Sequence, residues 1–401
     1  MNTIHAALEI GTTRTVLAIG ESENGGRVKI TSLAEIPSTG IRKSQILDIN
    51  QVTQSIRSVL QQIERQQDEA GSKITVYNAF LAVSGQHIKA DPLFGIAQVS
   101  NTRVGDEEIN EALRTSRAMT LPKDRELLDV IDQDYVLDNL SGITKPDGMA
   151  GRLLRLNTLH VHADRNRIQD ARTAAEAAHL ELRDPLFAAT CAADAVLEDH
   201  EKRNGALVLD LGGGSTGYAV YTDGYPVAVG VIGVGGDHVT NDIAHAFQTT
   251  NAQAEGLKKR VASAIVSTDN RENDRVKIEQ GENTLMDDRT ISRRALNTVV
   301  NARLSELFSV IRETLEERDV IHSLNAGVIL TGGGARMKDI ETLAQQSLGT
   351  SVRIGNPIHV DGLDNMDFPP SYAVIAGTLL YAHRNYEEKS LFRDFFGKIF
   401  K

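Results

Sequence analysis

Residues 8–19 read LEIGTTRTVLAI, and residues 209–220 read LDLGGGSTGYAV. In both stretches an apolar residue, an acid, an apolar residue and a glycine precede small or polar residues, a threonine and a return to apolar residues. Glu9 aligns with Asp210, and Gly11 aligns with Gly212. Two copies separated by about half the chain predict a duplicated, two-lobed α/β fold.

Each copy has the pattern of a β-hairpin with a tight glycine turn. Such a turn presents successive backbone N–H groups in a concavity that attracts phosphate oxygens. Hydroxyl groups can add further donors, namely those of Thr12, Thr13, Ser215 and Thr216. Two such hairpins on opposite sides of a cleft would hold a polyphosphate, and the acid at each strand end could hold a hydrated Mg²⁺.

Two more glycine turns occur in the second half. LTGGGARM, from Leu330, lies between an apolar strand and a helix start, which suits close approach of the backbone to a base or ribose. VIGVGGDHVTNDIA contains Gly235 and Gly236 just before a helix. One glycine cluster is weak evidence, because hairpins without ligands also contain them. Four clusters in a duplicated pattern, with no Walker motif and no GxGxxG strand–helix unit, favour nucleotide binding.

The composition restricts the class of protein. A chain of 401 residues exceeds one ordinary core, and a net charge of −11 argues against a nucleic-acid binder. The single cysteine, Cys191, excludes an internal disulfide and fits a reducing compartment, and we expect it to be buried rather than nucleophilic. The N-terminus has no basic region typical of a signal peptide, and no apolar run reaches about 18 residues.

Periodicity predicts the order of the elements. The first forty residues predict three strands, and residues 48–71 predict a helix with one apolar face, formed by Val52, Ile56, Val59, Leu60 and Ile63. Residues 85–162 have the pattern of an α+β insertion. Further helices are predicted in NRIQDARTAAEAAHLEL, PLFAATCAADAVLEDH and SYAVIAGTLLYAHR.

These hairpins and the LTGGGA turn resemble the actin, Hsp70 and sugar-kinase superfamily, and within it the FtsA family of actin-like bacterial division proteins. EIGTTRT resembles the family's phosphate-binding start, and LAVSGQHI with RELLDVIDQDYVLDNLSGITKPDGMAGRLLRLNTLHVHA resembles its inserted subdomain, called 1C. The match continues in order through VLDLGGGSTGYAVYTDG, GVGGDHVTNDIAHAF, AEGLKK and ISRRALNTVVNARLSEL. It implies a two-lobed, actin-like, duplicated ribonuclease-H-like fold.

The resemblance also implies boundaries and roles. Lobe 1A would comprise residues 1–84 and 163–204, the 1C insertion residues 85–162, and the second lobe residues 205–385 with subdomain 2B at roughly 245–315. Asp210 would hold Mg²⁺ through water. The residues implied to bind ATP are Gly11, Thr12, Thr13, Arg14, Gly212, Gly213, Gly214, Ser215, Thr216, Gly235, Gly236, Glu255, Lys258, Gly332, Gly333 and Gly334.

Three departures from the family's pattern bear on hydrolysis. Arg14 stands where the family commonly has Lys, Gly217 stands at a position that is often acidic, and Glu9 is longer than the aspartate of actin. We therefore expect ATP binding with at most weak turnover, and no catalytic residue is assigned.

The chain ends in SLFRDFFGKIFK, which holds four of its phenylalanines. At about 100° per residue, one half of the helical wheel is apolar and the other carries three cations and one acid. The apolar half consists of Leu391, Phe392, Phe395, Phe396, Ile399 and Phe400. The pattern fits a helix packed on the protein's own body equally well, but the resemblance favours a linker and membrane-targeting helix in residues 386–401.

The resemblance implies a division protein that binds ATP with Mg²⁺, polymerises, and links the FtsZ ring to the membrane. Its expected partners are the FtsZ C-terminal tail, further copies of itself, an anionic membrane surface and other divisome proteins, but no nucleic acid. Arg294 and Arg303 are candidates for the FtsZ dock, and the expected location is the cytoplasmic face of the cell membrane at the division site. The alternatives are a PilM-like pilus adaptor and a small-molecule kinase of the same fold.

Overall fold

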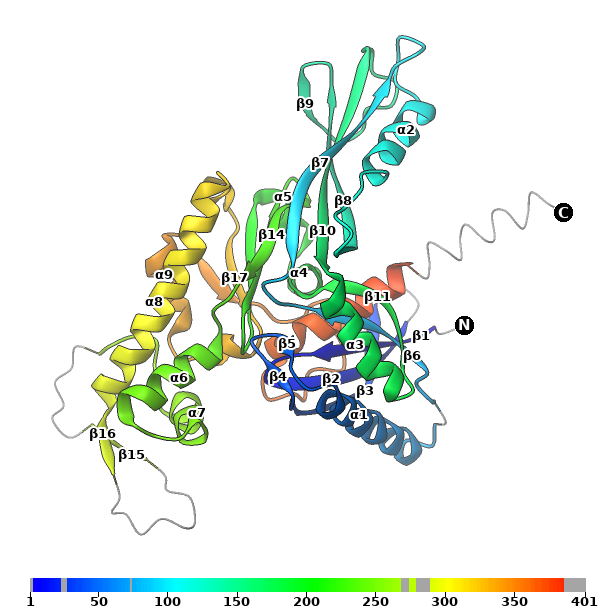
Figure 1. Ribbon diagram of the computed structural model, residues 1–401. Helices are drawn as coiled ribbons and strands as arrows, with labels where there is room; N and C mark the ends of the chain where they lie inside the picture. The colour runs from blue at the N-terminus through cyan, green and yellow to red at the C-terminus, as the bar shows by residue number, and fades with distance from the viewer. Residues whose placement is uncertain (1–2, 23–26, 73, 268–273, 279–288, 386–401) are drawn as a thin grey trace.

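The computed structural model describes residues 3–22, 27–72, 74–267, 274–278 and 289–385 (Figure 1). The first lobe is built on a six-stranded sheet in the order β11-β6-β1-β2-β3-β19. The first three strands of the chain are antiparallel, while β6 and β11 continue the sheet in parallel. Their bounds are β1 (Ile4–Ile10), β2 (Arg14–Ser22), β3 (Val28–Pro37), β6 (Asn78–Val83), β11 (Glu181–Phe187) and β19 (Val360–Asp361).

The second lobe repeats this arrangement in a five-stranded sheet of order β14-β13-β12-β17-β18. Its first three strands are again antiparallel, and two parallel strands again extend the sheet. The bounds are β12 (Ala206–Leu211), β13 (Thr216–Thr222), β14 (Tyr225–Ile232), β17 (Gly327–Thr331) and β18 (Val352–Ile354). The repeat read in the sequence is thus a repeat of whole sheets, and the predicted two-lobed α/β fold is confirmed.

Helix α1 (Ile49–Glu69) shows how the local sequence builds these lobes. Asp48 caps its N-terminus by accepting a hydrogen bond from the backbone N–H of Gln51. The predicted apolar face is buried in the core of the first lobe at Val52, Ile56, Val59 and Ile63, and Leu60 packs at its edge. The helix ends before Gly71, whose φ of +72° favours glycine.

The other helices cover the two sheets. In the first lobe these are α3 (Arg165–Ala177), α4 (Ala188–Val196) and the predicted last core helix, which spans 373–385, and α5 (Asp199–Asn204) follows α4 before the second sheet begins. The second lobe has α6 (Gly236–Phe247), α7 (Asn251–Arg260), α8 (Arg293–Glu317) and α9 (Ile340–Leu348). Short 3₁₀ turns are η1 (Ile321–Ser323), η2 (Gly333–Arg336) and η3 (Pro369–Tyr372), and two small hairpins pair β4 (Ile41–Arg42) with β5 (Gln45–Ile46) and β15 (Arg275–Lys277) with β16 (Thr290–Ser292).

A separate α+β unit projects beyond both lobes at the top of Figure 1. Its four-stranded sheet has the order β7-β10-β8-β9, and helix α2 (Asp106–Arg117) packs against it. Gly95 permits this packing, because a Cβ there would lie 1.8 Å from the carbonyl oxygen of Ala112 on α2. The strands are β7 (Lys89–Gln98), β8 (Arg125–Leu137), β9 (Leu140–Ile143) and β10 (Leu153–Asp164).

One prediction of secondary structure was wrong. The segment that begins PLF at Pro185 was expected to be helical from its start, and Glu181 and Leu182 were expected to end the preceding helix. Instead they form β11, which pairs in parallel with β6 and buries Leu186 and Phe187. Pro185 is tolerated because β11 is an edge strand, and helix begins only at Ala188.

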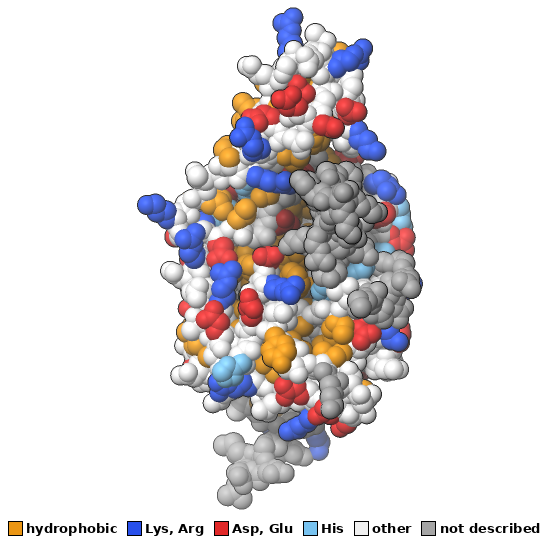
Figure 2. Space-filling model, turned by 90° about the vertical axis from the view of Figure 1, so that its right-hand side faces the viewer, with side chains coloured by type: hydrophobic (Ala, Val, Ile, Leu, Met, Phe, Trp, Pro, Cys, Tyr) orange, Lys and Arg blue, Asp and Glu red, His pale blue; other side chains and the backbone are white. Residues whose placement is uncertain are grey.

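Cys191 on α4 is buried, and burial raises the pKa of its thiol to about 12, as expected for a packing residue. None of the helices among the described residues is long and apolar enough to cross a lipid bilayer. Figure 2 shows one face of the molecule, on which acidic and basic side chains are interspersed over the described surface.

Candidate functional site

The turns of β1–β2 and β12–β13 have the same backbone hydrogen bond. The N–H of Gly11 donates to the carbonyl of Arg14 at 3.0 Å, and the N–H of Gly212 donates to the carbonyl of Ser215 at 3.1 Å. A Cβ at either glycine would lie within 3.0 Å of that carbonyl oxygen, since the distances are 2.9 and 2.8 Å. The two sequence copies therefore form equivalent tight turns, one in each lobe.

The turns face each other and touch. A Cβ on Gly213 would lie 2.1 Å from Oγ1 of Thr13, and a Cβ on Gly214 would lie 2.5 Å from Oγ1 of Thr12. Both glycines leave room for hydroxyls of the opposite lobe. The third member of the second turn, Ser215, places its hydroxyl 3.1 Å from that of Ser44 on the first lobe.

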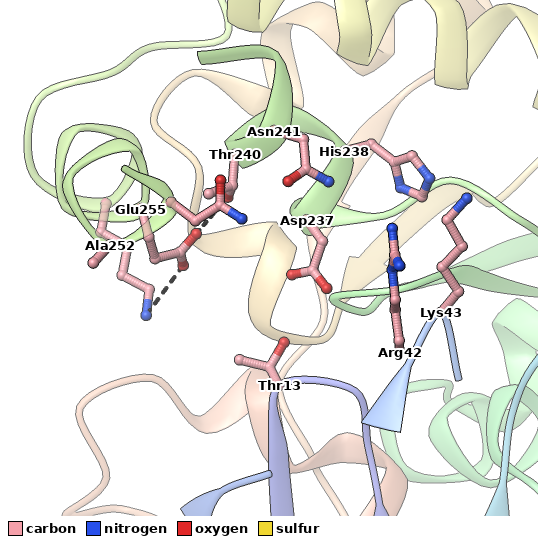
Figure 3. A pocket seen from close by; sticks show the side chains of 11 residues that line it. Thr13, Arg42, Lys43, Asp237, His238, Thr240, Asn241, Ala252 and Glu255 are labelled. Carbon is pink, nitrogen blue, oxygen red and sulfur yellow. Dashed lines mark hydrogen bonds and ion pairs between the residues drawn. The ribbon is translucent and has the colours of Figure 1, made fainter. Parts of the chain in front are cut away.

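A cavity of about 570 Å³ opens beside this contact, a size typical of small-molecule sites (Figure 3). Thr13 and the tip of the β4–β5 hairpin line it from the first lobe, and α6 and α7 line it from the second. Its lining residues are Thr13, Arg42, Lys43, Asp237, His238, Thr240, Asn241, Asn251, Ala252, Glu255 and Lys259.

Two carboxylates, Glu9 and Asp210, lie at the ends of β1 and β12 behind the turns. Burial raises the pKa of Asp210 to about 7; the negative charge of Glu9 adds to this shift and Arg14 opposes it. Burial likewise raises the pKa of Glu9, again against the influence of Arg14. Within the described residues, Oε2 of Glu9 is buried and has no hydrogen-bond partner.

The N-terminus of α6 is fixed to the second turn. The N–H groups of Gly236 and Asp237 donate to the carbonyls of Gly212 and Gly213 at 2.9 and 2.8 Å. Gly235 must be glycine, because a Cβ there would lie 2.5 Å from the carbonyl oxygen of Gly213. The predicted residues Gly235 and Gly236 thus position the turn through backbone contacts.

Lys258 and Glu255 on α7 form a network that closes onto α6. The Lys258 ammonium donates to the Gly236 carbonyl at 3.0 Å and to the Thr240 hydroxyl at 2.8 Å, and it pairs with Glu255 at 2.6 Å. Burial alone would raise the pKa of Glu255, but Lys258 lowers it overall. Glu255 lines the cavity together with Lys259, whereas Lys258 serves to join the two helices.

The third glycine turn lies on the other side of β12. A Cβ on Gly332 would lie 2.4 Å from Oδ1 of Asp210, and one on Gly334 would lie 2.8 Å from Cβ of Leu211. Gly333 has no neighbour within 4 Å of such a Cβ. These residues border Asp210 and Leu211 rather than the lining of the cavity.

The Arg14 guanidinium contacts residues outside the two glycine turns. It pairs with Glu35 at 2.6 Å, donates to the Ser371 carbonyl and lies 4.5 Å from the centroid of the Tyr372 ring. The sequence pattern predicted neither these contacts of Arg14 nor a role for Arg42, Lys43 and Ser44. The RKS tip contains no glycine or asparagine, so it gave no recognisable turn signal.

The arrangement fits a nucleotide with a hydrated cation. The cavity beside the two glycine turns has room for phosphates, and the unpaired Oε2 of Glu9 near Asp210 offers an acceptor for an Mg²⁺ that keeps most of its waters. The described ranges contain no cluster of three or more His, Cys, Asp or Glu side chains that could ligate a metal directly. Glu9 and Asp210 would therefore contact the cation through its bound waters.

The other predicted sites are separate from the cavity. Arg303 on α8 pairs with Asp242 at 2.6 Å and with Glu306 at 2.5 Å, so its guanidinium is already engaged. Arg294 lies in the first turn of the same helix. The residues predicted to contact the membrane all belong to 386–401 and lie outside the described residues.

Comparison with known proteins places the chain among division proteins. The family model for cell division protein FtsA matches residues 207–377, and the model for the SHS2 domain inserted in FtsA matches residues 85–162. The cell division protein FtsA of Pseudomonas aeruginosa is 32% identical over 375 residues, which cover 93% of this chain and 88% of the relative.

Solved structures agree on the fold. A PilM–PilN type IV pilus biogenesis complex gives a TM-score of 0.65 at 19% identity, covering 94% of this chain and 98% of that one. MreB5 of Spiroplasma citri bound to ADP gives a TM-score of 0.57 at 14% identity, covering 96% and 98%. At such low identity these neighbours establish a shared two-lobed, actin-like fold.

Proposed function

The chain belongs to the FtsA family of cell division proteins, and we propose that it binds ATP with Mg²⁺ in the cleft between its lobes. The observation that carries this proposal is the pair of equivalent glycine turns, which meet beside a cavity of about 570 Å³. Structural similarity to an MreB protein bound to ADP supports it. Bound nucleotide would supply a phosphate chain that interacts with both lobes at once.

The chain's own residues have clear roles in such binding. The turns at Gly11 and Gly212–Ser215 would surround the phosphates, Asp210 with Glu9 would hold the hydrated cation, and Glu255 would face the ribose. We assign a general base to none of the described residues, and Gly217 provides no acid at a position where many relatives of the fold have one. Turnover is therefore expected to be slow.

The proposed cellular role is to polymerise and to hold FtsZ against the cytoplasmic face of the cell membrane, where later divisome proteins join. The apolar half of the C-terminal segment supports membrane attachment, and its three cations suit anionic headgroups. Arg294 and Arg303 are the proposed dock for the acidic FtsZ tail. Because Arg303 is paired with Asp242 and Glu306, the tail must displace these carboxylates to bind it.

Equilibrium binding and co-sedimentation test the proposal. Full-length protein should bind ATP when Mg²⁺ is present and should sediment FtsZ with anionic vesicles. Removal of residues 390–401, or replacement of Phe392 and Phe396 with Asp, should abolish sedimentation and spare ATP binding. The matched control, Leu at both positions, should still bind vesicles. Undetectable ATP binding would refute the nucleotide role, and vesicle binding without the tail would refute the anchor.

A further inference from the structure

The tip of the β4–β5 hairpin has an unusual backbone. Ile41 pairs with Ile46 and Arg42 with Gln45, so Lys43 and Ser44 form a two-residue turn. Their φ angles are +49° and +58°. Two-residue hairpin turns with positive φ at both positions normally contain Asn or Gly, because a Cβ is strained there. The surrounding structure must therefore hold this tip in place.

Contacts to both phosphate turns hold it. The backbone N–H of Ser44 donates to Oγ1 of Thr12 at 2.9 Å, and its hydroxyl lies 3.1 Å from that of Ser215. On the second lobe, a Cβ added to Gly214 would lie 3.0 Å from Cα of Lys43. The tip thus touches the first turn within its own lobe and the second turn across the cleft.

This position directs two cationic side chains toward the cavity. Arg42 and Lys43 both line it, and Figure 3 shows them extending from the hairpin toward α6 beside Asp237. Both are exposed, and among the described residues neither makes an ion pair. Arg14, the cation expected at the phosphates, is engaged with Glu35 and Tyr372 instead.

The charges around the cavity require such cations. Asp237 and Glu255 are the acidic groups in its lining, and Lys259 is paired with Glu255 at 3.2 Å. A polyphosphate entering this space would be repelled by Asp237, whose negative charge Lys258 offsets in part. Arg42 and Lys43 are the remaining Lys and Arg side chains of the lining.

We infer that Arg42 and Lys43 bind the outer phosphates of the nucleotide, and that the hairpin tip is a third phosphate-binding element beside the two glycine turns. The inference rests on the proposed ATP binding and adds to it the residues that distinguish a triphosphate from a monophosphate. Ser44 positions them, because it fixes the turn between Thr12 and Ser215.

Replacement of both cations by glutamine tests the inference through affinity for ATP and AMP, without reference to turnover. For Arg42→Gln/Lys43→Gln we expect affinity for ATP to fall about tenfold or more, because charge-assisted contacts are lost. Affinity for AMP should change less than about twofold, because AMP lacks the outer phosphates. Arg27→Gln is the matched control: Arg27 pairs with Asp361, does not line the cavity, and should leave both affinities unchanged.

A conservative variant and the wild type complete the experiment. Arg42→Lys/Lys43→Arg keeps both charges and should retain most ATP affinity, and circular dichroism with thermal melting checks that each variant is folded. If the wild type binds ATP but the glutamine variant loses no preference for ATP over AMP, this inference is wrong and the proposed function stands. A wild type that binds no ATP overturns both.

Discussion

The two glycine turns, at Gly11 and Gly212, have the same backbone hydrogen bond but differ in their side chains. The first turn carries Thr12 and Thr13, whereas the equivalent positions of the second are Gly213 and Gly214. The hydroxyls of the first turn occupy the space that the glycines leave open. The duplicated motif has therefore diverged. The first turn carries hydroxyl side chains, the second carries glycines that leave space for them, and the two turns pack together.

The elements next to the turns diverge in the same manner. After both turns a buried threonine follows: Thr15 lies 2.9 Å from the Ser38 hydroxyl, and Thr216 donates to the Val234 carbonyl at 2.8 Å. Beyond them, the first lobe adds the β4–β5 hairpin with its cations, while the second adds α6 and α7. Each lobe therefore contributes a different chemistry to one cavity.

The largest effect on stability is expected from adding a side chain at Gly213 in the second turn. Gly213→Ala should lower the free energy of unfolding by about 1–3 kcal/mol, because its Cβ meets the Thr13 hydroxyl. ATP binding should weaken as the lobes are forced apart. Chemical denaturation of the variant and of Gly213→Ala/Thr13→Ala checks this, since removal of the Thr13 hydroxyl should restore much of the loss. No recovery in the double variant would mean that the two turns do not contact each other.

A second test concerns the acids, Glu9 and Asp210. Because the folded-state pKa of Asp210 is raised from 3.8 to about 7, its contribution to stability is present at low pH and is lost as pH rises between these values. Asp210→Asn should therefore stabilise the nucleotide-free protein at pH 8 and have little effect near pH 4. Thermal unfolding across this range measures the difference. A pH-independent difference would contradict the raised pKa, and unchanged Mg²⁺ dependence of ATP binding would exclude Asp210 from the cation site.

Arg14 and Ser215 hold equivalent positions in the two turns. Arg14, however, contacts Ser371 and Tyr372 of the 3₁₀ turn η3, which precedes the last core helix. Arg14→Gln should cost about 1–2 kcal/mol of unfolding free energy through loss of the contacts to Glu35, Ser371 and Tyr372. ATP affinity should change much less than in the Arg42/Lys43 variant. A large loss of affinity with unchanged stability would instead assign Arg14 to the phosphates.

The smallest effect is expected at Ser44, which connects the two turns. Ser44→Ala removes the hydroxyl contact to Ser215 and should cost about 0.5–1 kcal/mol. Ser44→Gly removes the same hydroxyl but relieves the positive φ, so it should be nearly neutral. Denaturation midpoints of the two variants compare these effects, and equal losses would show that backbone strain at the tip is unimportant.

Local sequence was sufficient to predict the structure wherever the residues that determine it lie within one helix, strand or turn. The alternation of the hairpins, the glycine at each turn, and the apolar face of α1 with Asp48 as its cap depend on neighbouring residues, so they could be predicted. The alignment of Glu9 with Asp210 predicted a duplicated, two-lobed fold, and the structure extends the repeat to whole sheets. The family resemblance identified the α+β insertion as subdomain 1C and added further candidate residues, among them Glu255 and Lys258.

Only the tertiary structure decided where several of those side chains point. Arg14 turns toward Ser371 and Tyr372, residues far along the chain, and β11 is a strand because β6 lies beside it. Arg42 and Lys43 enter the cavity because Ser44 is held by Thr12 and Ser215 in a backbone that its own sequence disfavours. The sequence alone therefore specified the two halves of the site, while contacts between distant residues determined which cations complete it.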